Sequence, residues 1–147
     1  MDVIDLAPLN LPPPDRQLLA DIDWSEAAAL WNENRLDELH DWLNERWSRL
    51  VRNSMLASKD PEAELLQGLA YAALAFYFTQ HRNQDGALML LDDAVMMLAK
   101  YRPAFLGVHV DPLVDALSQL RPLLLTLAPT DECPLYPFVL PKFTWTA

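Results

Sequence analysis

The residues of this chain that could do chemistry gather around His40. Glu38 lies two residues before it and Asn44 lies one helical turn after it, in a stretch whose apolar spacing predicts a helix. A metal bound by His40 would need further ligands from another helix, because one turn of one helix does not supply a full set. Gln67 is the nearest polar candidate on a neighbouring helix. A base or metal ligand at His40 would define a small enzyme.

The same residues also have a purely structural interpretation. A buried polar group without a partner is costly, so His40 and Gln67 can be explained as hydrogen-bonding to each other inside an apolar bundle. On this interpretation the substitution His40→Ala lowers stability by about 1 to 3 kcal/mol. We expect this structural role rather than a catalytic one, and we predict no catalytic residue, no metal and no cofactor.

The other residues that could take part in catalysis or ligand binding are weaker candidates for a functional site. His81 is expected at a helix C-terminus, where a capping contact is ordinary, and His109 is expected in a loop. Cys133 has no basic residue beside it to lower its pKa, so a nucleophilic role is not expected. The three glycines are too dispersed for a phosphate-binding loop.

Composition limits the partners and the compartment. The chain has 147 residues, 52% of them hydrophobic, and a formal net charge of −10. An acidic protein is repelled by phosphate backbones, so nucleic acid is not an expected partner. One cysteine allows no internal disulfide, and the acidic, proline-containing N-terminus lacks the pattern of a secretory signal. No apolar run is long enough to span a membrane as a helix. We therefore predict a cytoplasmic protein.

The elements that must position these residues are all helical. Apolar residues at helical spacing predict five helices, and no stretch alternates as a strand would. The predicted helices cover about 23–34, 36–52, 61–80, 84–100 and 111–128. The fold class is all-α: a compact five-helix bundle of two antiparallel hairpins plus a closing helix, flanked by proline-rich arms. The predicted division is an arm at 1–22, a helical domain at 23–128 and an extended tail at 129–147.

Several positions within these helices carry specific expectations. Helix starts are predicted from a capping box at Asp23 and Glu26, and from aspartate–proline pairs at 60–61 and 111–112. The third helix is apolar nearly all round, so other helices must surround it, and Gly68 should mark a close helix crossing. The second hairpin weakly matches a tetratricopeptide repeat. Three methionines are expected to fill gaps in the core: Met89, Met96 and Met97.

The tail combines prolines with large apolar side chains. Four prolines from 129 onward rule out a regular helix, yet the segment is too apolar for a solvated linker. We therefore expect it to run extended and to anchor through its aromatic residues on a helical surface of this chain or of a partner. The candidate partner-binding residues are Tyr136, Phe138, Phe143 and Trp145.

The segment from Leu30 to Trp47 resembles the signature of a family of small helical proteins, domain-of-unknown-function family 309. Its pattern of Glu, His, a further Glu and Trp is matched by Glu38, His40, Glu45 and Trp47. A second match begins at residues 65–69 and continues through Asn83 to Tyr101-Arg102-Pro103. The resemblance implies a fold and a polar cluster but no reaction. The cluster comprises Glu38, His40, Asp41, Asn44 and Gln67.

This sequence departs from the family pattern at three positions of the cluster. Asp41 replaces a glutamate, Asn44 replaces an acidic residue, and Leu39 replaces a small residue. These changes weaken an acid–base or metal role. We therefore predict a non-catalytic protein-interaction module or an accessory subunit of a larger assembly with a protein partner. The alternative is a small metal-dependent or acid–base enzyme with an inter-helix pocket around His40.

Overall fold

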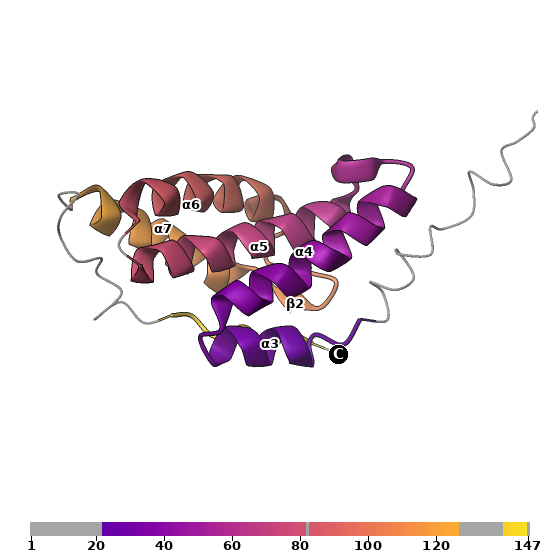
Figure 1. The fold of residues 1–147 in the computed structure, drawn as a ribbon, viewed down its shortest axis with the longest axis horizontal. Helices are drawn as coiled ribbons and strands as arrows, with labels where there is room; N and C mark the ends of the chain where they lie inside the picture. The colour runs from indigo at the N-terminus through magenta and orange to yellow at the C-terminus, as the bar shows by residue number, and fades with distance from the viewer. Residues whose placement is uncertain (1–21, 82, 127–139, 147) are drawn as a thin grey trace, which may run out of the picture.

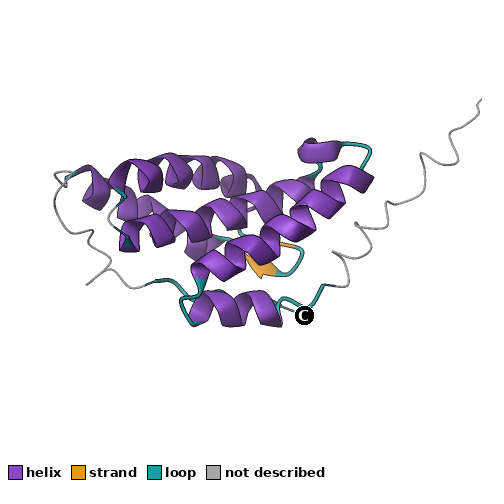
Figure 2. Ribbon diagram, in the orientation of Figure 1, coloured by secondary structure: helices purple, strands orange, loops and turns teal. Residues whose placement is uncertain are grey.

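The computed structural model describes residues 22–81, 83–126 and 140–146, and within them the protein is an all-α bundle (Figures 1 and 2). The predicted fold class is confirmed. The helices are α3 (Ser25–Asn32), α4 (Leu36–Asn53), α5 (Pro61–Gln80), α6 (Gln84–Leu98) and α7 (Asp111–Leu125), with short 3-10 turns η1 (Ala57–Lys59) and η2 (Ala99–Tyr101). Two short strands, β1 (Ala104–Phe105) and β2 (Val108–His109), form an antiparallel hairpin.

Helix α5 is the centre of the bundle, as its apolar sequence predicts. It packs most extensively on α6 and then on α4, while α7 packs on α6 and α3 packs on α4. Twelve of its residues are buried, whereas residues 64, 67, 71, 74 and 78, which share one side of the helix, are half-buried. Neighbouring elements cover most of the helix, because exposing its apolar side chains would leave apolar surface in water.

The close crossing predicted at Gly68 is present between α5 and α6. A Cβ added at Gly68 would lie 2.8 Å from Cδ2 of Leu98 and 3.3 Å from Cβ of Met97. These separations are shorter than carbon atoms tolerate in a packed core, so the glycine allows the two helices to approach.

Two of the three predicted helix starts show the expected contact of an aspartate with the amide two residues on. Asp60 accepts a hydrogen bond from the amide of Glu62 and caps α5, as predicted. Asp23 makes the same contact, because its carboxylate accepts from the amide of Ser25 at 2.9 Å, just before the first turn of α3. An aspartate bonds readily to the amide two residues on.

The cap predicted at Asp111, the third helix start, is wrong. Asp111 is the first residue of α7 rather than its cap, and its carboxylate lies 2.6 Å from Nε of Arg102. A bond between a carboxylate and a guanidinium joins two charged groups and is stronger than a bond to an uncharged amide, so the carboxylate of Asp111 pairs with Arg102.

Two further expectations are corrected. The hairpin of β1 and β2 was not predicted, since strands of two residues are too short to show an alternating pattern. Met89 and Met96 do not fill the core and are 63% and 61% exposed. The buried stripe of α6 instead comprises Ala87, Leu90, Leu91, Ala94 and Leu98.

Among the described residues, no helix is both long and apolar enough to cross a bilayer. The predicted boundary between helical domain and tail, at 128/129, lies outside the described residues, and so do Tyr136 and Phe138.

Candidate functional site

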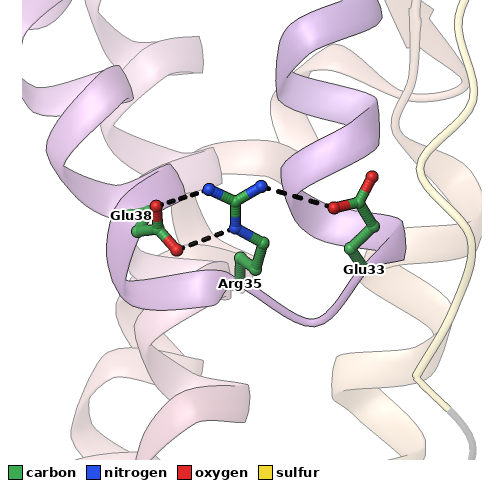
Figure 3. A network of polar contacts seen from close by, with 3 residues as sticks. All are labelled: Glu33, Arg35 and Glu38. Carbon is green, nitrogen blue, oxygen red and sulfur yellow. Dashed lines mark hydrogen bonds and ion pairs between the residues drawn. The ribbon is translucent and has the colours of Figure 1, made fainter.

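The polar motif of α4 begins with a network around Arg35, just before the helix (Figure 3). Its guanidinium donates to both carboxylate oxygens of Glu38, through Nε at 2.8 Å and Nη2 at 2.7 Å, and Nη1 lies 3.4 Å from Glu33. The hydrogen bonds from Arg35 hold the pKa of Glu38 below its usual range. Since this carboxylate is exposed and already paired, it is oriented as part of a surface ion pair rather than as a general acid.

His40 and its neighbours form the second part of the motif. The imidazole is half-buried, and its Nδ1 lies 3.3 Å from Oδ1 of Asp41. Asp41 itself is largely in water, and Asn44, one turn further along α4, is exposed. The imidazole of His40 is therefore held by one carboxylate that is itself largely in water, and not by a set of buried polar groups.

The structure does not join His40 to Gln67. The amide of Gln67 donates to the hydroxyl of Tyr71 at 3.1 Å, four residues along the same helix. The predicted hydrogen bond between His40 and Gln67 is therefore wrong. Each side chain instead finds a partner within its own helix, since neighbours one or four positions away need no exact alignment of two helices.

A second site, which we call the tail groove, lies between α3 and the β1–β2 hairpin and holds residues 140–146. Phe143 is its anchor and is only 3% exposed. The ring lies 6.1 Å from that of Trp24 and 6.1 Å from that of Trp31, while Trp31 packs edge-on to Phe76. Aromatic pairs at such distances add to the free energy of simple area burial.

Polar contacts from α3 fix the backbone of this segment. The side chain of Asn32 accepts from the amide of Phe143 at 3.0 Å and donates to its carbonyl at 3.3 Å. The indole Nε1 of Trp31 donates to the carbonyl of Pro141 at 2.6 Å. The three bonds contact main-chain atoms, so α3 recognises an extended backbone and one aromatic side chain.

The hairpin completes the tail groove from the other side. The amide of His109 donates to the carbonyl of Thr144, and the amide of Thr146 donates to the carbonyl of Gly107. The two imidazole nitrogens of His109 lie 2.7 Å from the hydroxyl oxygens of Thr144 and Thr146. A Cβ at Gly107 would lie 2.4 Å from the carbonyl oxygen of Thr146, so only glycine lets the segment approach.

The candidate partner-binding residues that can be examined are therefore engaged within the chain. Phe143 is buried, and Trp145 is half-buried and forms an isolated antiparallel bridge with Val108. Residues 140–146 pack through Phe143 on a surface of this chain that α3 and the hairpin supply. Sequence reasoning did not single out Trp31 or Asn32, because nothing local links them to residues 110 positions away.

One apolar surface of α6 stays in water. Met89 and Met96 are seven residues apart, so they lie on one side of the helix. Between them Asp92 pairs with Arg121 of α7, with Nε 2.8 Å from Oδ1. This surface is called the methionine surface below.

No metal site emerges within the described parts of the chain, where no three or more side chains among His, Cys, Asp and Glu converge. His81 and His109 have other partners there. The imidazole Nδ1 of His81 donates to the carbonyl of Tyr77 at 2.7 Å, at the C-terminus of α5 as expected, and its ring stacks on Tyr77.

The fold and the motif define a small helical-bundle protein whose polar signature lies on α4. Residues 24–90 match the family described as Domain of unknown function (DUF309), as the motif of α4 indicates. The matched segment spans α3 to the middle of α6. Comparison with curated proteins and with solved structures gives no match.

Proposed function

We propose that this protein is a non-catalytic interaction module that binds a protein partner through the methionine surface of α6. The observation that supports the proposal is the exposure of Met89 and Met96, at 63% and 61%, on one side of a well-packed helix. Large apolar side chains grouped in water are typical of docking sites, and methionine adapts its shape to different partners.

The surroundings of the two methionines suit a protein partner. Asp92 and Arg121 form an ion pair between them, and the hydrogen bonds that Arg121 donates to Asp92 raise the pKa of Arg121 above its usual range. Both charges are exposed and available to polar groups at the rim, while the methionines supply the apolar centre. An apolar centre with polar edges is the usual composition of a protein interface.

The alternative function, an enzyme built around His40, has no contact in its favour among the described residues. Its imidazole lies against Asp41, and Gln67 bonds to Tyr71. We extend the proposal to an accessory subunit of a cytoplasmic assembly, because the single cysteine and the acidic composition fit a reducing compartment. A tetratricopeptide-like role for the α5–α6 hairpin belongs to the same proposal.

The experiment places charge on the methionine surface. The double substitution Met89→Glu and Met96→Glu is compared with Met55→Glu, which changes a residue 68% exposed in the turn after α4. Partners are co-purified from the cells in which the chain is native and quantified by mass spectrometry. We expect the double variant to lose a partner that Met55→Glu and the parent both retain, since buried unpaired carboxylates oppose binding. Retention of every partner by a folded double variant would contradict the proposal.

A further inference from the structure

Residues 140–146 occupy the tail groove in the manner of a bound peptide. The segment runs extended and adds to the β1–β2 hairpin through the bridge between Val108 and Trp145. Two main-chain hydrogen bonds join it to His109 and Gly107. Pairing of an added strand with a sheet edge, together with a pocket for one side chain, is a recurring mode of peptide recognition.

The contacts also define which segment fits. The pocket of Trp24 and Trp31 takes an aromatic ring, and Asn32 bonds to both main-chain polar groups of the residue that carries it. Two positions earlier, Trp31 binds a carbonyl, and proline serves there because only its carbonyl is used. Lys142 is exposed and therefore contributes little to selection. The groove thus selects a buried aromatic residue and accepts a proline two residues before it.

This groove and its ligand are joined only through the chain between Thr126 and Leu140. That connection contains thirteen residues, which reach at most about 45 Å when fully extended. A contact that forms within one chain through such a connection forms equally between two chains, with identical atoms on both sides. The segment with the required sequence is present in every copy of the protein.

We propose that the tail groove is a peptide-binding site, and that residues 140–146 of a second copy of this chain occupy it as the segment of the same chain does. The second copy then contributes Phe143 to the aromatic pocket, and two copies exchange tails. Because the tail is attached to its own chain, its effective concentration at its own groove is high, and at low protein concentration it binds there. Binding of a tail from a second copy therefore requires a high protein concentration or a groove that its own tail does not fill.

The test mixes two full-length variants. Phe143→Ala leaves a groove without its anchor, and Asn32→Ala leaves a tail whose own groove holds it less tightly. We expect the mixture to form a heterodimer, measured by sedimentation velocity, at about ten times the level found for either variant alone. In the matched control, Lys142→Ala replaces Phe143→Ala; its groove is filled by its own tail, so no heterodimer is expected.

A mixture that stays monomeric while both variants melt cooperatively would overturn the proposal. Should Phe143→Ala lose its cooperative melt, a synthetic peptide with the sequence of residues 140–147 is added to the full-length variant. Recovery of the melt by the peptide, and not by a peptide with alanine at the phenylalanine position, supports binding between chains. Absence of recovery would overturn it.

Discussion

The polar motif of α4 and the tail groove differ in how their residues are held. On α4, Glu38, Asp41 and Asn44 are exposed, and His40 is half-buried beside a solvated carboxylate. In the tail groove, Phe143 is buried between two tryptophans, and its backbone is bonded on both sides of the residue. The motif that identifies the family is therefore mostly a surface feature, whereas the groove is part of the core.

The comparison teaches that the residues by which a family is recognised need not be those that contribute most to the free energy of unfolding. The segment 24–90 matched by the family includes Trp24, Trp31 and Asn32, but the ligand that they hold lies beyond it. Burial of an aromatic side chain contributes several times more to stability than an exposed ion pair. Substitutions in the tail groove should therefore lower the free energy of unfolding more than substitutions in the polar motif of α4.

The largest effect is expected for Phe143→Ala. Emptying a pocket between two indoles removes the buried ring and leaves a cavity, which lowers the free energy of unfolding by about 3 kcal/mol. Urea denaturation followed by tryptophan fluorescence measures the loss. Lys142→Ala, one residue earlier and exposed, is the control and should change stability by less than about 0.5 kcal/mol. Equal stability of the two variants would show that the tail groove adds nothing to the core.

A smaller loss is expected for Asn32→Ala. The substitution removes both bonds to Phe143 and lowers the free energy of unfolding by about 1 to 2 kcal/mol. Asn44→Ala removes the same side chain from the exposed motif of α4 and should be near neutral. Amide exchange at Phe143 should accelerate in the first variant only; acceleration in both would remove the distinction between the regions.

Substitution of Glu64 should change the free energy of unfolding by an amount between those expected for the two regions, because this carboxylate is largely covered. The change should depend on pH. Burial raises the pKa of Glu64, but hydrogen bonds from Lys100 and Tyr101 outweigh it, and the result lies below the usual 4.5. A lowered pKa in the folded state means that Glu64 stabilises the protein at neutral pH and loses this contribution as the pH falls below 4.5.

Glu64→Gln should therefore lower stability by about 1 kcal/mol at pH 7 and much less at pH 3. Thermal melts across this range measure the convergence of the two curves. For Glu38→Gln, where the ion pair is exposed, the difference at pH 7 should be smaller. Parallel curves for Glu64→Gln and the parent would show that this carboxylate has the same pKa in both states.

The smallest effect is expected for His40→Ala. The sequence alone predicts a loss of 1 to 3 kcal/mol from a stranded partner, on the scale of an unsatisfied buried group. The contact with solvated Asp41 strands no buried group, so a change within about 0.5 kcal/mol is expected instead. Calorimetric unfolding measures it, with Asp41→Ala as the matched variant. A loss above 1 kcal/mol would restore the structural role of His40.

The sequence alone determined the helices and much of their packing, because these features have local causes. The aspartate–proline pair at 60–61 predicted the start of α5, and its apolar sequence predicted that neighbouring helices pack around it. The glycine at position 68 marked a close crossing, and the motif of α4 identified the family. Prolines and aromatic residues together predicted an extended, anchored tail.

Only the tertiary structure decided which distant groups meet. Phe143 enters a pocket whose walls come from residues more than 100 positions earlier, and no local pattern encodes that pairing. Position on the helix, rather than residue type, left Met89 and Met96 in water. The carboxylate of Asp111 pairs with Arg102, nine positions earlier, which the folded chain brings within reach. Hydrophobic burial is non-directional, so composition predicts that a core forms, whereas shape and geometry select the contacts within it.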